Sequence, residues 1–315
     1  MKSLSKKLMT VMMLLTVLSI NLISSDTAYA TSKKKMAFTS KVSSLKAGKS
    51  YTFKTNMPKA DTKWKVSNTK IATISSTGKL TAKKVGKVTV TATYKKQKVT
   101  ITVAITPKKI IGIDPGHQEK QNKGLEPIGP GSSTKKQKVS SGTQGVATKV
   151  PEYKLTLTIA KKLKTELENR GYQVVMTRTS NNVNISNKER ALLLNKKKVD
   201  IAIRLHADGS TNRNTTGASS LYTSTANRYV SKSISKKSKK LSDAVISAYC
   251  KETKIKNRGS VVRNDLTGNN YSKVPTICFE MGFMSNAKED RSMQTASMQT
   301  KMVKGLANGI DNYFK

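Results

Sequence analysis

The chain has 315 residues, which is more than one sandwich-sized domain needs and enough for two domain cores. Its 59 lysines and arginines outnumber 18 aspartates and glutamates, and the resulting formal net charge of +41 favours polyanionic partners. With 5% aromatic residues and no zinc-finger spacing, the composition argues against nucleic acid as the partner. Anionic wall polymers fit this charge better, and a lysine-rich solvated surface is the alternative explanation.

Residues 1–30 have the pattern of a signal peptide that is removed on export. Three lysines precede a largely apolar run over residues 8–23, and Ala28-Tyr29-Ala30 matches a signal peptidase site. The alternative is a membrane anchor, but this run is short for a bilayer span and is interrupted by polar side chains. No later apolar run is long enough to cross a membrane. We therefore expect a mature protein that is secreted, associated with the cell wall and not inserted in the membrane.

The next segment, residues 37–106, has the alternation of half-buried strands. Apolar and polar residues alternate over residues 99–106 and over residues 87–92, and Gly78 and Gly86 separate short strand candidates. No helical periodicity interrupts the pattern. The segment is predicted to be a small antiparallel all-β sandwich.

Blocks of this segment resemble a known family. They are Trp64-Lys65-Val66-Ser67-Asn68, Ile71-Ala72-Thr73-Ile74, and Thr77-Gly78-Lys79-Leu80-Thr81-Ala82 followed by Val85-Gly86-Lys87-Val88-Thr89-Val90. They resemble the bacterial immunoglobulin-like domain, group 2, which implies an adhesive or spacer domain over residues 31–108 with no catalytic residues. Pro107 marks the boundary, because proline ends a strand ladder. The domain holds 19 lysines and one acid, a charge of +18 that is expected to raise residence on the wall.

After the boundary, short apolar runs alternate with helical patterns, which predicts an α/β domain over residues 109–315 with helices against a sheet. Strands are expected at residues 110–113, 173–176, 200–205 and 276–280. Residues 118–150, rich in glycine, serine and lysine, are expected to form a long loop beside a site.

Helices are expected at four places in this domain. They follow Pro151, the Ser186/Glu189 capping-box pattern, the apolar spacing near Leu241, and the C-terminal run from Met298 to Ile310. The two cysteines, Cys250 and Cys278, lie 28 residues apart in apolar contexts, so we expect buried free thiols rather than a disulfide.

The chain has two histidines, and each follows or ends a predicted strand. His117 comes after the first strand of the α/β domain, and His206 comes at the end of the strand over residues 200–205. In an open α/β sheet such strand ends meet at one edge and form the site. A catalytic zinc takes three protein ligands, often two histidines and a carboxylate. Glu152 is the candidate carboxylate, because it opens a helix whose apolar face points toward the sheet.

A zinc hydrolase also needs a group that accepts a proton from water and returns it to the leaving amine. Glu280 ends an apolar predicted strand, where a carboxylate is hard to explain as a surface residue. The alternative is a buried ion pair between Glu280 and a lysine. The chain has neither a phosphate-binding P-loop nor the G-x-S-x-G elbow of a serine hydrolase.

Four ordered blocks of residues 109–315 resemble a second family. They are Ile111-Gly112-Ile113-Asp114-Pro115-Gly116-His117, Pro151-Glu152, Asp200-Ile201-Ala202-Ile203-Arg204-Leu205-His206-Ala207-Asp208, and Glu280-Met281-Gly282-Phe283-Met284-Ser285-Asn286. They resemble the zinc N-acetylmuramoyl-L-alanine amidases of the amidase-3 type. The resemblance implies that His117, Glu152 and His206 are zinc ligands and that Glu280 is the catalytic acid/base. It further implies that Arg263, in the stretch Arg263-Asn264-Asp265-Leu266, orients the substrate.

Two positions depart from that family's pattern. Gln118 begins a long basic loop where glycines commonly follow the first histidine, and Arg204 stands where a serine is common. The first departure leaves the ligand set intact and bears on the preference for a stem peptide.

The predicted function is zinc-dependent hydrolysis of peptidoglycan at the amide between N-acetylmuramic acid and L-alanine of the stem peptide. Glu280 would accept a proton from water and deliver it to the departing L-alanine nitrogen, while zinc polarises the lactyl carbonyl. Two alternatives stay open at this point. One is a zinc peptidase that cuts within the stem peptide, and the other is an inactive basic cell-wall adhesin.

Overall fold

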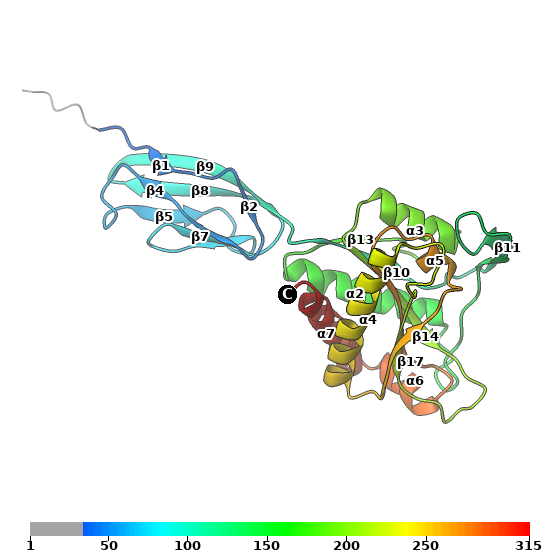
Figure 1. The fold of residues 1–315 in the computed structure, drawn as a ribbon. Coiled ribbons are helices and arrows are strands. Elements are labelled where there is room, and N and C mark those ends of the chain that lie inside the picture. The colour runs from blue at the N-terminus through cyan, green and yellow to red at the C-terminus, as the bar shows by residue number, and fades with distance from the viewer. Residues whose placement is uncertain (1–33) are drawn as a thin grey trace, which may run out of the picture. The chain divides into compact units, whose positions relative to one another are not determined.

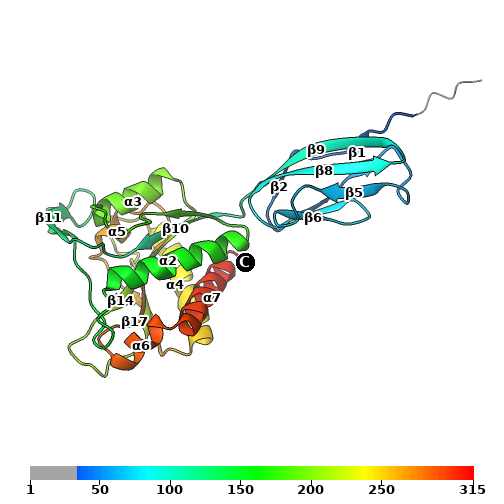
Figure 2. The same cartoon turned by 180° about the vertical axis from the view of Figure 1, so that it is seen from behind.

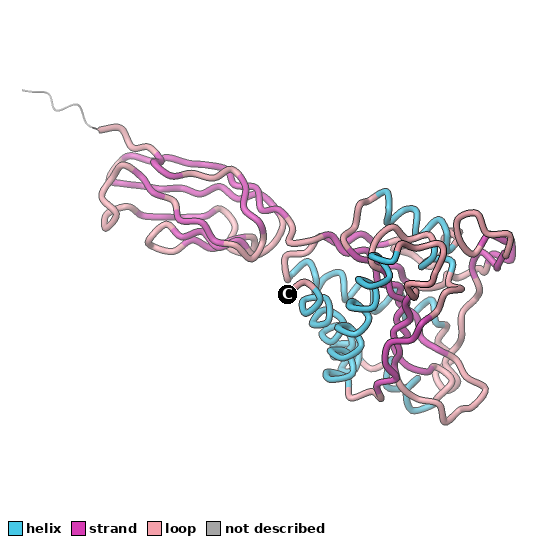
Figure 3. The backbone as a smooth tube through the Cα atoms, viewed as in Figure 1, coloured by secondary structure: helices cyan, strands magenta, loops and turns pink. Residues whose placement is uncertain are grey.

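The computed structural model describes residues 34–315, so the predicted signal peptide over residues 1–30 lies outside the described residues. Figure 3 shows strands and loops but no helix in the N-terminal part of the described chain, and strands flanked by helices in the C-terminal part. Among the described residues, every helix is too short or too polar to cross a bilayer.

The N-terminal domain is built from short strands that form two main sheets within the described residues. A four-stranded sheet has the order β2-β9-β8-β5, a three-stranded sheet has the order β3-β7-β6, and β1 pairs with β4. The strands are β1 Phe38–Ser40, β2 Ser44–Lys46, β3 Ser50–Thr52, β4 Lys54–Thr55, β5 Lys63–Val66, β6 Ala72–Ile74, β7 Lys79–Ala82, β8 Gly86–Tyr94 and β9 Gln97–Thr106.

The core of this domain explains why the alternation signal was strong. Val88 and Val90 of β8 and Val103 of β9 are fully buried, and they pack with Phe53 and Leu80 of the other sheet region. Intervening threonines and lysines face solvent or the rim, which produces the period of two. The all-β sandwich prediction is confirmed.

One part of that prediction is wrong, because the sandwich is not wholly antiparallel. β2 pairs with β9 in the parallel direction, with Ser44 opposite Ala104 and Lys46 opposite Thr106. A three-residue edge strand carries no alternation from which its partner or direction could be inferred. The direction is decided by where the chain enters the sheet.

The C-terminal domain contains, among the described residues, a six-stranded sheet of order β13-β10-β14-β17-β15-β16. Its strands are β10 Ile110–Pro115, β13 Gln173–Met176, β14 Ile201–Asp208, β15 Ala218–Tyr222, β16 Asn257–Val262 and β17 Thr276–Phe283. Adjacent strands run parallel except β15 and β17, which are antiparallel. A β11–β12 hairpin lies outside this sheet, with strands Asn122–Pro127 and Lys135–Val139.

Helices cover the two faces of this sheet unequally. They are α2 Glu152–Asn169, α3 Asn187–Lys196, α4 Lys232–Thr253, α5 Thr267–Asn270, α6 Ala287–Gln294 and α7 Ala296–Tyr313. Figures 1 and 2 show α2, α4 and α7 lying side by side, and their apolar faces join one core with strand residues such as Ile201, Ile203 and Leu205. Ala202, on the opposite face of β14, packs instead against Leu194 of α3.

This two-sided packing positions the site. Because side chains alternate along a strand, Arg204 and His206 of β14 lie on the same face as Ala202, away from the main core. Cys278 and Glu280 of β17 lie beside them, with Arg204 paired to Cys278 and His206 paired to Glu280 in the strand register. One face of the sheet is therefore an apolar core, and the other carries polar side chains.

Most elements predicted for this domain are confirmed. Strands occur at all four expected places, although β14 and β17 continue to Asp208 and Phe283, and α3 begins with the complete Ser186/Glu189 capping box. The loop expected over residues 118–150 contains the β11–β12 hairpin instead. Its strands are short and lysine-rich, so they lack the apolar alternation by which strands are recognised. Cys250 and Cys278 are buried free thiols, as expected.

Candidate active site

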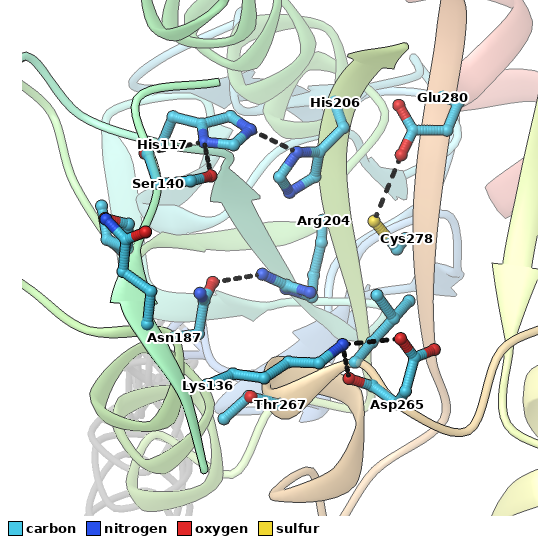
Figure 4. A pocket seen from close by; sticks show the side chains of 13 residues that line it. His117, Lys136, Ser140, Asn187, Arg204, His206, Asp265, Thr267, Cys278 and Glu280 are labelled. Atoms are coloured by element: carbon cyan, nitrogen blue, oxygen red, sulfur yellow. Dashed lines mark hydrogen bonds and ion pairs between the residues drawn. The ribbon is translucent and has the colours of Figure 1, made fainter. Parts of the chain in front are cut away.

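Three of the predicted site residues come together at one edge of the sheet. His117 follows β10, Glu152 is the first residue of α2, and His206 lies on β14. Nε2 of His117 and Nδ1 of His206 each lie 3.1 Å from Oε1 of Glu152, and these two nitrogens lie 3.1 Å from each other. Figure 4 shows the two imidazoles facing each other. The three donor atoms thus converge on one point.

A hydrogen bond to the backbone determines which nitrogen of His117 faces this point. Nδ1 lies 3.0 Å from the carbonyl oxygen of Ser140. A carbonyl oxygen can only accept, so Nδ1 carries the proton and donates it. Nε2 is left with its lone pair directed at Glu152 and His206, as a metal ligand requires.

The backbone at His117 is held in an unusual conformation by two buried arginines. His117 has φ = 59°, in the left-handed region that residues other than glycine rarely adopt. Arg178 donates to the carbonyls of Pro115 and Gly116, and Arg190 donates to those of Pro115 and His117. Two guanidinium groups therefore fix the three consecutive carbonyls of residues 115–117. This orients the imidazole of His117.

Asp114 balances part of this buried positive charge. Its carboxylate accepts hydrogen bonds from Arg190, Arg204 and Thr177, and its side chain is 1% exposed. Burial by itself would raise the pKa of Asp114, but the two guanidinium groups hold that pKa well below its usual range. Burial lowers the pKa of Arg178 to about 10, so Arg178 stays charged at neutral pH.

Glu152 is a buried carboxylate with both oxygens in use. Oε1 accepts from the Ala207 amide at 3.0 Å, and Oε2 accepts from the Thr143 amide at 2.9 Å. Burial would raise the pKa of Glu152, but the neighbouring His117 and His206 side chains hold that pKa well below its usual range. Burial lowers the pKa of His206 to about 4, so that imidazole is neutral at pH 7.

Two glycines leave room for the imidazoles. A Cβ at Gly116 would collide with the ring of His206, and a Cβ at Gly142 would lie 2.8 Å from the ring of His117 and 2.7 Å from Oε2 of Glu152. Gly142 also has φ = 77°, which favours glycine. The space around the three donor atoms therefore depends on residues without side chains.

This arrangement fits a metal ion. Two neutral imidazoles and one carboxylate form a ligand set of catalytic zinc sites. A second group, His206, Cys278 and Glu280, also has its donor atoms within 4.8 Å of one another. It fits a metal less well, because burial raises the pKa of both the Cys278 thiol and the Glu280 carboxyl, and metal ligands must be deprotonated.

Glu280 lies beside the three converging residues. It is paired with His206 in the strand register, and one of its oxygens lies 3.8 Å from Sγ of Cys278. Burial, with added repulsion from Glu152 and Asp208, raises the pKa of Glu280 well above its usual value. Within residues 34–315 Glu280 forms no ion pair, so the alternative of a buried pair with a lysine is wrong.

A cavity of about 340 Å³ opens beside these residues, and we call it the histidine cavity. Its lining includes His117, Arg204, His206, Cys278, Glu280 and Asn187. Figure 4 shows Lys136 of the β11–β12 hairpin bonded to Asp265 at the rim, with Nζ 2.6 Å from the carboxylate. The hairpin therefore supplies one wall of the cavity.

Arg263 lies in a different place from the other predicted site residues. It does not line the histidine cavity but a neighbouring cavity of about 480 Å³, of which Glu280 is also a wall. Its guanidinium group donates to both oxygens of Asp265, at 2.8 and 3.0 Å. The structure thus places Arg263 close to Glu280 but away from His117, Glu152 and His206.

Several residues at the site were not predicted as functional. Arg204 and Cys278 each lie two positions before a predicted residue on the same strand, and the alternation of a strand places both on the face of the site. That signal was available in the sequence. No comparable signal exists for Lys136 or Asn187, which reach the cavity from a hairpin and a helix that are distant in sequence.

Each of the two parts of the chain matches a known protein family. Residues 111–312 match the family model described as N-acetylmuramoyl-L-alanine amidase, and residues 32–103 match that of the bacterial Ig-like domain (group 2). The chain is 24% identical over 201 residues to the N-acetylmuramoyl-L-alanine amidase AmiC of Escherichia coli. That alignment covers 53% of this chain and 48% of AmiC.

Solved structures are similar to the C-terminal domain. The N-acetylmuramoyl-L-alanine amidase of Clostridium difficile 630 is 27% identical with a TM-score of 0.53, covering 65% of this chain and 96% of that one. The amidase Ami1 of Mycobacterium smegmatis is 22% identical with a TM-score of 0.60, covering 66% and 97%. At 22% identity, the similarity to Ami1 shows a shared fold and nothing further.

The sheet, its flanking helices and the polar cluster at its edge define an α/β domain that carries a hydrolytic site. The chain belongs to the N-acetylmuramoyl-L-alanine amidase family, and an immunoglobulin-like domain precedes its catalytic domain. It is an enzyme that hydrolyses the amide between N-acetylmuramic acid and L-alanine in peptidoglycan, and it acts on the cell wall. This membership favours the amidase over a peptidase that cuts within the stem peptide and over an inactive adhesin.

Proposed function

We propose that the amidase is zinc-dependent and that His117, Glu152 and His206 are the zinc ligands. The observation that carries this proposal is the convergence of three donor atoms, two imidazole nitrogens and one carboxylate oxygen, at 3.1 Å from one another. A zinc ion bound by such residues supplies Lewis acidity toward a carbonyl and lowers the pKa of water toward neutrality.

Glu280 is proposed to be the catalytic acid/base. Its carboxyl lies next to the ligand trio and lines both cavities, so it can reach an amide that spans them. It accepts a proton as water attacks the lactyl carbonyl carbon, and it returns that proton to the nitrogen as the C–N bond breaks. The products are a free carboxyl on the lactyl group of muramic acid and a stem peptide with a free L-alanine amino group.

Further parts of the proposal concern the rest of the chain. Arg263 is proposed to orient the substrate from the second cavity. Residues 1–30 are proposed to be a signal that directs secretion, residues 31–108 to bind anionic wall polymers, and residues 109–315 to form the catalytic domain. The lysine-rich composition of residues 31–108 supports the second of these roles.

A metal assay combined with mass spectrometry of digested peptidoglycan tests the enzymatic proposal. We expect stoichiometric zinc in the purified protein and new free amino groups on L-alanine that disappear when a chelator is present. New amino groups on another stem residue would contradict the assigned bond.

The ligand assignment has its own test. His206→Ala should abolish stoichiometric metal binding, because the chain has no spare histidine to replace it. A folded His206→Ala protein that still carries one zinc per chain would show that His206 is not a ligand.

A further inference from the structure

Glu280 separates the histidine cavity from the second cavity, which we call the arginine cavity. The arginine cavity lies over β15, β16 and β17, and its lining includes Asp208, Ser219, Lys256, Arg258, Arg263 and Glu280. Ser219 of β15 lies opposite Glu280 of β17 in the antiparallel register. An amide held at Glu280 would therefore have one cavity on each side.

The arginine cavity contains three cationic side chains, two of which are not engaged in ion pairs among the described residues. Within the described residues, neither Lys256 nor Arg258 forms an ion pair. Arg263 is paired with Asp265, which also binds Lys136. Two acids line the cavity, Asp208 and Glu280, and both lie on its side toward the ligand trio.

The guanidinium group of Arg258 is held in place by two uncharged partners. Its guanidinium group donates to the carbonyl of Thr216 at 3.2 Å and lies 5.4 Å from the centre of the Phe283 ring. Neither of these two contacts is with an anion, and Asp208 of the same cavity interacts with Arg258 through electrostatic attraction without an ion-pair contact. A guanidinium group fixed in this way and left exposed can form a bidentate pair with a carboxylate.

We propose that the arginine cavity receives the stem peptide and recognises its free carboxylate groups through Arg258 and Lys256. This inference rests on the proposed function and names the side of the site on which the leaving group lies. N-acetylated sugars are neutral, whereas the glutamate that follows L-alanine in a stem peptide bears a free carboxylate. Of the two halves of the substrate, only the peptide therefore matches a cationic cavity.

The orientation of the amide leads to the same assignment. The carbonyl carbon must lie toward the ligand trio, and the nitrogen must lie where Glu280 can protonate it. The peptide continues from that nitrogen, on the side of Glu280 that faces away from His117 and His206. The arginine cavity is the space on that side.

Equilibrium binding of product peptides tests the inference without requiring turnover. The probes are L-alanyl-D-glutamate and L-alanyl-D-isoglutamine, which differ in one carboxylate, and calorimetry is performed on the full chain. We expect the wild-type protein to bind the glutamate peptide about tenfold more tightly, as one charge-assisted contact provides. Arg258→Gln and Lys256→Gln should each reduce that preference to about threefold or less.

Lys301→Gln is the matched control, because Lys301 is an exposed cation on α7 that does not line the cavity. It should retain the full preference. Equal binding of the two peptides by the wild-type protein, or a preference that survives in both cavity variants, would overturn the inference. Release of L-alanine amino groups from peptidoglycan by the same preparation reports the proposed function separately, so the two failures are distinguishable.

Discussion

At the scale of single residues, Glu280 is the side chain on which the proposed chemistry depends most directly. Its carboxyl is half-buried, has no ion-pair partner in the described chain, and has a pKa raised by its surroundings. A raised pKa makes the carboxylate a better proton acceptor, so it can take a proton from water and hold it for the leaving amine. Burial on the polar face of β17 is what gives Glu280 that capacity.

Glu280→Gln should lower the rate of amide hydrolysis by a factor of about a hundred to ten thousand, the usual contribution of a general acid/base. The glutamine cannot transfer the proton, but the three ligand residues are unchanged, so zinc should be retained. Rates on purified peptidoglycan and metal content measured on the same sample check this. Glu168→Gln, on α2, is the control and should be fully active; full activity in Glu280→Gln would falsify the assignment.

Asp114 shows how a buried charge behind the site affects stability. Asp114→Asn leaves Arg190 and Arg204 without their shared carboxylate, and breaking such a buried pair costs about 3–5 kcal/mol. The pKa of Asp114 is lower in the folded than in the unfolded state, so its contribution is complete above the unfolded value and is lost as the pH falls below about 4.

The stability difference between wild type and Asp114→Asn should therefore be largest near neutral pH and shrink in acid. Urea unfolding of both proteins at pH 7 and pH 3.5 measures it. A difference that stays constant between these two pH values would contradict the assigned pairing.

At the scale of elements, the end of β10 is the part of the fold that most needs support. The chain there turns into a left-handed residue, His117, and the carbonyls of residues 115–117 point to Arg178 and Arg190 rather than to a neighbouring strand. Backbone groups that leave a ladder need other partners when they are buried. The two arginines meet that need and fix the direction of a ligand.

Arg178→Gln should weaken zinc binding by about tenfold to a hundredfold, the usual effect of removing a group that orients a ligand. Competition with a chelator measures the affinity, and circular dichroism checks that the fold persists. Arg213→Gln, an exposed change in the loop after β14, should leave the affinity unchanged. An affinity in Arg178→Gln equal to that of the wild type would show that the β10 end is held without Arg178.

At the scale of the whole molecule, the positive charge is the dominant feature. Residues 31–108 contribute +18, and the sandwich they form contains its own apolar core. Because the lysines are exposed and spread over the domain, their attraction to a polyanion is long-range and is screened beyond about 8 Å at physiological ionic strength.

Binding of the full chain to cell walls should therefore weaken strongly as salt increases, and a chain that lacks residues 31–108 should bind less at low salt. Sedimentation with insoluble walls at several salt concentrations measures both. Walls stripped of their anionic polymers are the control and should bind less of the full chain. Salt-insensitive binding would rule out an electrostatic origin.

The sequence was sufficient for the fold class and for selecting the residues that the fold brings together at the proposed site. Strands β10, β14 and β17 are buried and rich in apolar residues, so their pattern is strong. His117 follows β10, Glu152 begins α2, and His206 and Glu280 lie in the C-terminal halves of β14 and β17, so the parallel strands bring their side chains toward one edge. At these residues the apolar pattern of each element and its place in the sheet predict the same site.

Other features depended on the tertiary structure. The β11–β12 hairpin, the parallel pairing of β2 with β9, and the separation of Arg263 from the histidines arise from contacts between segments that are distant in the chain. A lysine-rich hairpin and a three-residue edge strand bury too little apolar surface to leave a periodic signal. The periodicity of the sequence indicates which side chains become buried. The arrangement of charged groups around Glu280 depends instead on which strands become neighbours. Only the folded chain determines which strands these are.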